Sequence, residues 1–553
     1  MVRWDRVATL FIALVGTWPF AGAFWGRIPG DRVLPVDGAH TAWVYEVVRS
    51  ALAGNDNLLH TLSVWYPTGQ SLLLAEQNLL DAFLAAPFLT ALGTQHGMAA
   101  FVLLVLIGNA IAAGWLGELV GGRGLPGPVA ASIVAFCPFI WGETYVGRYT
   151  QSFLLPSVLA MAVAWKAAHS GRQGGVTGIM LGTTGLAYWF YGAFAATLVG
   201  GLFAGAIATA RPVGPMIKTL ALAAGIPLLV AAVPAAFIAA TWSAMPGANT
   251  QNPMPVYTRF AGGLPWAPTG ELIAYIPQLL VIPAVILLVS RPTGPTVGLA
   301  VATALLACTA AGDFVRIGTL DIPTPLAAIR QVPGLDRFWW PHRALGAVTL
   351  GLAALVARSA ALPGRLRWLA VTAAALSAVQ ASWNPVTRGS WVLPPRPAWD
   401  TALPPGPVVI LPLRARDPGK RMIAEWTTHH RPLVNGKSMW EDFLWPENYR
   451  RWFTSQPLLS SLLAVEDAHG KYRHVPRGRN AAAAKVEFET ALRAAFALDG
   501  RSLAGLREVS VVGFVAGHAD TPRELFEILN GLCGDPATDG NSSWWVLSDC
   551  SSD

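Results

Sequence analysis

Apolar runs separated by short polar connections cover the first 383 residues. A transmembrane helix needs about 17–25 mainly apolar residues, and the frequent Gly and Pro of these runs are tolerated in membrane helices. The first run contains a cleavage-like Ala21-Gly22-Ala23, but Trp and Phe flank it and more spans follow, so we expect it to stay uncleaved. The pattern predicts about eleven spans: 7–25, 98–118, 127–141, 152–168, 175–190, 193–210, 217–241, 270–290, 296–311, 344–357 and 367–382.

Polar segments interrupt and follow these runs. Residues 26–79 are predicted to form a long loop with short amphipathic helices, and 80–93 a helix at the membrane interface. After a Pro-rich linker, strand-like runs at 408–411 and 509–515 alternate with helix-like runs at 481–498 and 522–532. We therefore predict a mainly α polytopic membrane core over 1–383 and an α/β domain over 384–553.

Composition supports this class. Of 553 residues, 53% are hydrophobic and only 13% are charged, against about a quarter charged in a typical soluble domain. A disordered, collagenous or ordinary cytosolic protein is therefore excluded.

The formal net charge of +7 raises the question of a polyanionic partner. Residues 384–553 contain 19 basic and 19 acidic side chains, so the whole excess lies in the apolar part. This distribution argues against a protein that binds nucleic acid. It indicates instead that the positive charges orient the chain in the membrane.

With the N-terminus in the cytoplasm, the cytoplasmic connections carry +9 and the outer connections of the core carry −2. The domain at 384–553 then lies outside a bacterial cytoplasmic membrane. Cys533 and Cys550 fall in that domain, where a disulfide is permitted, although two free thiols remain the alternative.

Common catalytic motifs are not matched. Asn435-Gly436-Lys437-Ser438 ends like a phosphate loop, but Arg431 stands where the first glycine is required. The chain contains no CxxC pair, no paired-His metalloprotease motif and no Gly-x-Ser-x-Gly elbow. We expect no cofactor, and the sequence leaves metal dependence open.

The outer loops instead gather polar and aromatic residues suited to a lipid-linked anionic substrate. A carboxylate there can take a proton from a hydroxyl, Arg and His can hold a phosphate, and aromatic rings suit both the interface and sugar faces. The candidates are Asp31, Asp37, Tyr66, Glu143, Arg148, Tyr149, Tyr191, Arg337, His342 and Arg343.

Each candidate also has a structural interpretation. Asp37 precedes an amphipathic run and can be a helix cap. Arg148 and Arg343 can extend to the interface from span ends. Tyr191 can belong to an aromatic belt, His342 can be a packing residue, and Glu143 can be a solvated residue at a span end.

Several segments together resemble the class C glycosyltransferase superfamily, in particular its uncharacterised bacterial multi-spanning members. The similar segments are Asp37 to Tyr45, Tyr66-Pro67-Thr68-Gly69, Tyr188 to Gly192, Trp340-Pro341-His342-Arg343, Leu411-Pro412-Leu413 and Leu433 to Gly436. No adjacent Asp-Glu pair follows the first span, and Trp544-Trp545 lacks the Trp-Trp-x-x-Asp spacing, so the protein mannosyltransferase and oligosaccharyltransferase subgroups are disfavoured.

The resemblance implies an active site on the outer face, a polyprenyl-phosphate sugar donor and an inverting transfer to a glycan, lipid or protein acceptor. It implies that a first-loop Asp is the general base, which by position is Asp37, with Asp31 second. Arg148, Arg337 or Arg343 would hold the phosphate. The alternative is a non-catalytic membrane component of a cell-surface glycan assembly or carrier system.

Overall fold

The computed structural model describes residues 3–31, 37–58, 60–69, 72, 79–209, 213–243, 278–317, 320–329, 331, 341–382, 389–413, 424–435, 447–474, 479–517 and 521–550. The chain forms two compact units. The helical unit comprises Met1–Gly38, Gln77–Phe237 and Thr250–Val392, and the α/β unit comprises Ala39–Glu76, Ile238–Asn249 and Leu393–Asp553.

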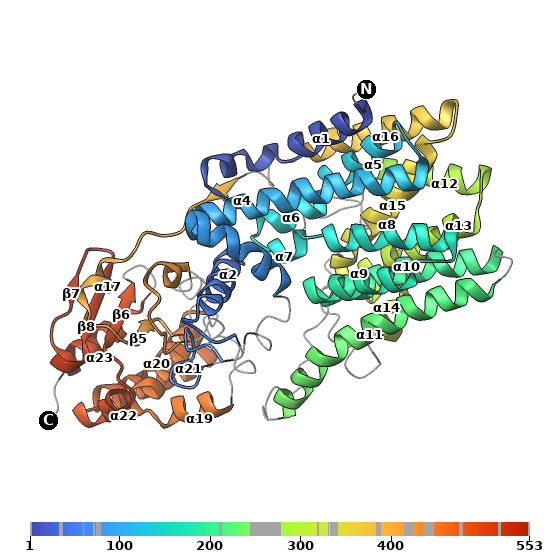
Figure 1. The fold of residues 1–553 in the computed structure, drawn as a ribbon. Coiled ribbons are helices and arrows are strands. Elements are labelled where there is room, and N and C mark those ends of the chain that lie inside the picture. The colour runs from blue at the N-terminus through green and yellow to red at the C-terminus, as the bar shows by residue number, and fades with distance from the viewer. Residues whose placement is uncertain are drawn as a thin grey trace. The chain divides into compact units, whose positions relative to one another are not determined.

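The first half of the helical unit is built around one long helix, α4, which packs against α1, α5 and α8 (Figure 1). α4 contains the expected interface helix and the next expected span in a single element, broken at Gly93, where φ is +76°. The elements are α1 (Trp4–Val15), η1 (Trp18–Trp25), β1 (Ile28–Pro29), α4 (Leu80–Gly121), α5 (Pro126–Ala135), α6 (Pro138–Tyr145), α7 (Tyr149–Ser152) and α8 (Leu155–Ser170).

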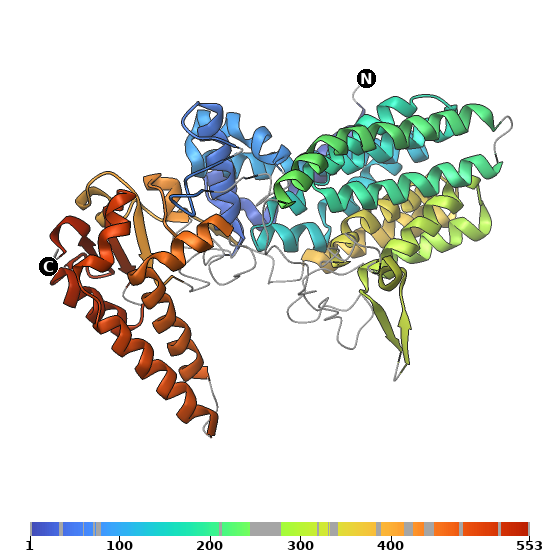
Figure 2. The same ribbon diagram turned by 90° about the horizontal axis from the view of Figure 1, so that it is seen from below.

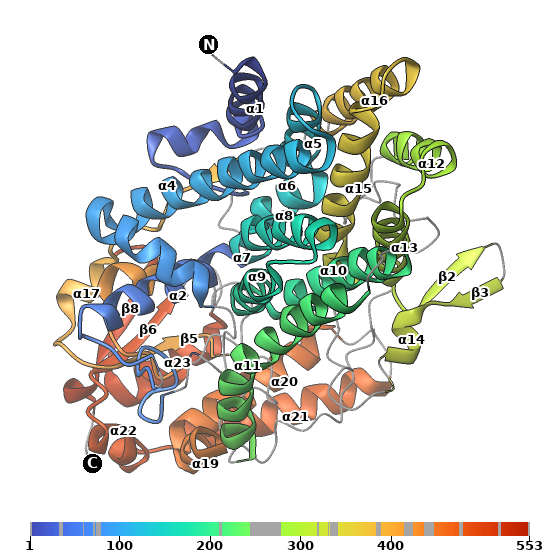
Figure 3. The same cartoon turned by 45° about the vertical axis from the view of Figure 1, so that its right-hand side comes forward.

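The second half is a layer of helices in which α10 lies beside α9 and α13 (Figure 3). Glycines allow the close contact of α10 and α13, because a Cβ on Gly201 would lie 2.5 Å from the Gly298 carbonyl oxygen. The elements are α9 (Gly174–Ala187), α10 (Trp189–Thr209), α11 (Gly214–Ser243), η2 (Gln278–Leu280), α12 (Val281–Ser290), α13 (Gly294–Ala310), α14 (Pro325–Ile329), η3 (Pro341–Arg343), α15 (Ala344–Ala360), α16 (Arg365–Ser382) and β4 (Ser390–Trp391).

Two small antiparallel pairings complete this unit. β1 pairs with β4, and β2 (Phe314–Ile317) pairs with β3 (Leu320–Pro323). The second pair forms a hairpin that projects from the helices beside α14 (Figure 2).

Three helices of the described segments are long and apolar enough to cross a membrane: Leu80–Gly121, Tyr149–Ser170 and Trp189–Thr209. Trp4–Val15 and Trp18–Trp25 make a fourth span if they count as one, although the pair is bent by 77°. Four more apolar helices have 10–17 residues. The mainly helical prediction is confirmed, while the count of eleven spans stays a prediction.

The α/β unit contains a four-stranded sheet in the order β5-β6-β8-β7, in which β5 and β6 are parallel and the other pairs antiparallel. β5 (Val408–Leu411) is buried along its whole length, as its continuous apolar run predicts. The other elements are α2 (Gly38–Leu52), α17 (Ala398–Ala402), α19 (Glu447–Ser455), α20 (Pro457–His474), α21 (Arg479–Phe496), η6 (Gly500–Leu503), α22 (Ala504–Glu508), β6 (Gly513–Gly517), α23 (Arg523–Cys533), β7 (Ala537–Thr538), β8 (Ser542–Val546) and η7 (Leu547–Asp549).

A disulfide joins Cys533, at the end of α23, to Cys550, just after η7. This bond resolves the alternative that the sequence left open. It ties the last helix of the unit to the segment that follows β8.

Candidate functional site

An ion pair connects two of the candidate residues across 111 positions of sequence. Arg148 Nε donates a hydrogen bond to Asp37 Oδ2 at 2.5 Å. The backbones meet beside this pair, since a Cβ on Gly147 would lie 2.3 Å from the Gly38 nitrogen. Gly147 also has φ of +83°, a conformation that glycine adopts without a steric penalty. A glycine contact therefore sets the approach of the two charged residues.

Glu143 extends the ion pair into the protein interior. Its Oε2 lies 3.6 Å from Arg148 Nη1, and its Oε1 lies 3.6 Å from His342 Nε2. Burial by itself raises the pKa of this carboxyl, but Arg148, His342 and Arg343 outweigh burial and hold the pKa at about 2. Asp37, Arg148, Glu143 and His342 thus form a chain of ionisable groups, which we call the Asp37 cluster.

Exposure separates the members of this cluster. The side chain of Asp37 is 37% exposed and that of Arg148 is 26% exposed, whereas the side chain of Glu143 is only 6% exposed. A substrate can reach the Asp37 carboxylate and part of the Arg148 guanidinium, while Glu143 stands behind them. The solvated-residue interpretation of Glu143 is therefore wrong, because this side chain is enclosed between two basic groups.

Arg343 takes a different position from Arg148. It is 9% exposed, its guanidinium carbon lies 5.3 Å from the Tyr188 ring centroid and 5.6 Å from that of Phe190, and it donates to the Tyr188 hydroxyl. These contacts are cation–π interactions. The alternative interpretation, that Arg343 extends to the interface, is wrong, since Arg343 is buried against aromatic rings.

Two candidate tyrosines are buried in the helical unit. The Tyr191 hydroxyl donates to the Gln151 carbonyl, and the Tyr149 hydroxyl donates to the Pro29 carbonyl while accepting from Trp391 Nε1. Both residues are 2% exposed, so the belt interpretation of Tyr191 is wrong. Their hydroxyls tie the segment from Tyr149 to Gln151 to α10 and to β1.

The remaining candidates lie elsewhere or outside the described residues. The Asp31 backbone N–H donates to the Tyr145 carbonyl at 2.8 Å, which places Asp31 beside the end of α6. Tyr66 belongs to the α/β unit, where its N–H donates to the Leu433 carbonyl. Arg337 lies outside the described residues.

Sequence reasoning gave no role to two residues that support the cluster. Asp81 is 1% exposed and accepts a hydrogen bond from Thr150 Oγ1 at 2.6 Å. Asn109, inside the apolar run of α4, donates to the Ser152 carbonyl at 2.7 Å. Both bonds hold the segment carrying Arg148 against α4. A polar amide within an apolar span was the available signal.

A metal centre has no ligand set in the part of the chain that the structure describes. No group of three or more His, Cys, Asp or Glu residues there is arranged to hold an ion.

Neither a protein-family model nor a curated protein sequence matches the chain. Several solved structures of other proteins, however, are similar to this chain. Arabinofuranosyltransferase AftD from Mycobacteria matches 99% of this chain with a TM-score of 0.51 and 14% identity. The chain spans 40% of the length of AftD. The archaeal oligosaccharyltransferase AglB from Archaeoglobus fulgidus, in complex with an inhibitory peptide and a dolichol-phosphate, matches 96% of this chain and 71% of its own, at 12% identity and a TM-score of 0.46.

The likeness to AftD extends over nearly the whole chain, and AftD is a class C glycosyltransferase. At 14% identity the match is evidence of fold alone. This chain has a class C glycosyltransferase-like fold.

Proposed function

We propose that this protein is an inverting glycosyltransferase that moves a sugar from a polyprenyl-phosphate donor to an acceptor hydroxyl on the outer face of the cytoplasmic membrane. The observation that carries the proposal is the Asp37–Arg148 pair: an accessible carboxylate held by a guanidinium in a fold of this class. A base for the acceptor hydroxyl and a cation for the leaving phosphate are two groups that such a transfer needs.

In the proposed reaction, Asp37 accepts the proton of the acceptor hydroxyl. The acceptor oxygen forms a bond to the anomeric carbon, and the bond from that carbon to the phosphate oxygen breaks. The leaving polyprenyl phosphate keeps the electron pair. Its negative charge is stabilised by Arg148, because guanidinium and phosphate form charge-assisted hydrogen bonds.

Glu143 and His342 serve as positioning residues in this scheme. Glu143 lies behind Arg148 at 3.6 Å and is almost fully covered. A fixed anion there orients the guanidinium before the donor binds, which lowers the cost of reorganisation during the reaction.

Two observations support the proposed side of the membrane. The connections predicted to be cytoplasmic carry the positive charge excess, and disulfides persist mainly in oxidising compartments such as the periplasm. The Cys533–Cys550 bond fits an outer location for the α/β unit.

The test is Asp37→Asn in the full-length protein, assayed for sugar transfer from a radiolabelled polyprenyl-phosphate donor. Asn keeps the size of Asp and still accepts from Arg148, so the fold should persist while transfer falls by about 10²–10⁴-fold. Asp31→Asn is the matched control. If Asp31→Asn loses activity while Asp37→Asn retains it, the general base is Asp31 rather than Asp37. Full transfer in both variants would contradict the assignment of an Asp base and favour the non-catalytic role.

A further inference from the structure

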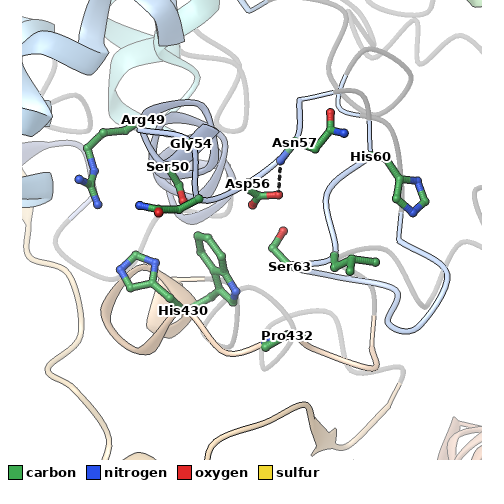
Figure 4. Close-up of a pocket in the computed structure, with 12 residues that line it drawn as sticks. Arg49, Ser50, Gly54, Asp56, Asn57, His60, Ser63, His430 and Pro432 are labelled. Atoms are coloured by element: carbon green, nitrogen blue, oxygen red, sulfur yellow. Dashed lines mark hydrogen bonds between the residues drawn. The ribbon is translucent and has the colours of Figure 1, made fainter. Parts of the chain in front are cut away.

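The α/β unit contains a cavity of about 590 Å³ that no part of the proposed transfer uses. One wall is the end of α2 and the turn after it, with Arg49, Asn55, Asp56 and His60. The other wall is the 426–432 segment, with Trp426 and His430. Figure 4 shows Arg49, Asp56 and His430 around the same space. Cavities of about 300–1,000 Å³ are typical of small-molecule sites.

Hydrogen bonds fix the two walls of this cavity. Thr61 Oγ1 donates to Asp56 Oδ2 at 3.0 Å, and the Leu433 N–H donates to the Ser63 carbonyl at 3.0 Å. The Val408 N–H donates to the Pro432 carbonyl, which connects the second wall to the sheet strand β5. The cavity is therefore pre-formed, as sites that bind without large rearrangement are.

The charges around the cavity disfavour an anionic ligand. Arg49 Nε lies 3.1 and 3.0 Å from the two carboxylate oxygens of Glu46, a fully buried side chain that neutralises this guanidinium. Burial lowers the pKa of His430, with only partial opposition from Glu46, so His430 is neutral at pH 7. Asp56 adds a carboxylate that repels phosphate.

The lining is instead rich in groups that bind hydroxyls. Asn55 offers one amide acceptor and two donors, and its side chain makes no hydrogen bond to any residue that the structure describes. The Trp426 indole N–H is buried and has no acceptor within the described ranges. A buried donor of this kind favours a ligand that supplies an acceptor.

We propose that this cavity binds a neutral saccharide of one or two sugar units. A polyhydroxylated ring matches the mixture of donors and acceptors, the volume, and the balance of charge around Arg49 and Asp56 among the described lining residues. The inference goes beyond the proposed function, since binding here needs neither a lipid-linked donor nor the Asp37 cluster.

The experiment is saturation-transfer NMR with titration, on the full-length protein in detergent micelles. The probes are an α-1,5-linked arabinofuranosyl disaccharide, mannobiose and maltose, with mannose 6-phosphate and inorganic phosphate as anionic probes. We expect at least one neutral disaccharide to bind and both anionic probes to bind more weakly.

The test variant is Asn55→Ala, at an exposed position outside regular structure. It should weaken binding by up to about tenfold, the effect of one or two lost hydrogen bonds. The matched control, Asn541→Ala, changes an exposed Asn between β7 and β8 and should leave affinity unchanged.

The inference would be overturned by no binding of any neutral probe at millimolar concentration, or by binding that is insensitive to both Asn55→Ala and the cavity-filling Asn55→Trp. Stronger binding of phosphate or mannose 6-phosphate would overturn it as well. Asp37→Asn should bind the saccharide like the wild type, so failure here and failure of the proposed transfer are distinguishable.

Discussion

Removing the buried charge behind Arg148 provides a stringent test of the Asp37 cluster. The substitution is Glu143→Gln, which keeps the volume of the side chain and removes its negative charge. Arg148 then loses one of the two carboxylates that lie within 4 Å of it among the described residues, and His342 loses its contact with a carboxylate. The local fold has to accommodate basic groups that are no longer balanced.

The magnitude follows from the distance of 3.6 Å between Glu143 Oε2 and Arg148 Nη1. At an effective dielectric constant of about 20, this separation corresponds to about 4–5 kcal/mol of attraction. The desolvation of the carboxylate offsets part of this attraction, and breaking a buried pair typically costs about 3–5 kcal/mol. We expect Glu143→Gln to destabilise the helical unit by about 3 kcal/mol.

The assay is the apparent melting temperature in detergent, followed as a function of pH. The folded-state pKa of Glu143 is about 2, below its ordinary value of 4.5. Its contribution to stability is therefore complete above pH 4.5 and is lost as the pH falls through 2. The difference between wild type and Glu143→Gln should shrink over that window.

Glu118→Gln is the matched control. Glu118 pairs with Arg3 and Arg6, whose side chains are 32% and 64% exposed, so its loss should cost less than about 1 kcal/mol. An equal or larger destabilisation by Glu118→Gln, or an unchanged melting temperature for Glu143→Gln at pH 7, would refute the reasoning.

Two further predictions concern a backbone contact and a buried histidine. Gly147→Ala should reduce both transfer and stability, because its Cβ would meet the Gly38 backbone. In the control Gly122→Ala, the residue also has positive φ but faces open space, so only stability should fall, by about 1 kcal/mol. An equal loss of transfer in both variants would contradict this prediction. Burial, partly opposed by a nearby carboxylate, lowers the pKa of His429 from 6.5 to about 3, so its contribution to stability is complete above pH 6.5 and is lost as the pH falls toward 3. Hydrogen exchange in the α/β unit should show this loss of stability at low pH in the wild type and in the control His60→Gln, and a smaller loss in His429→Gln. An equal loss in all three proteins would show that His429 is not its cause.

The sequence predicted where apolar helices lie better than it predicted where they bend or join. The expected span at 98–118 and the expected interface helix at 80–93 are one element in the structure, α4, and Gly93 interrupts it. The first apolar run, 7–25, is bent by 77°. Hydropathy reports how apolar a segment is, while bends depend on glycine conformation and on neighbouring helices.

The candidate site shows the same division. Residue types and their expected side of the membrane were enough to nominate Asp37, Arg148, Glu143 and His342 as separate residues of three outer loops. Their contacts join positions up to about two hundred residues apart, and no periodicity encodes such a distance. Burial of Glu143 and the enclosure of Arg343 by aromatic rings became visible only with the fold.

The sequence by itself determined the class of the protein: an apolar, mainly helical chain with an asymmetric charge distribution and polar loops between the apolar runs. These properties depend only on the residue types within each segment, so they are the same however the segments pack. Only the tertiary structure decided that a glycine contact brings Asp37 to Arg148, and that the turn after α2 and the 426–432 segment enclose a polar cavity. Both depend on close packing between segments distant in the chain, which is set by the three-dimensional fit of side chains and backbone.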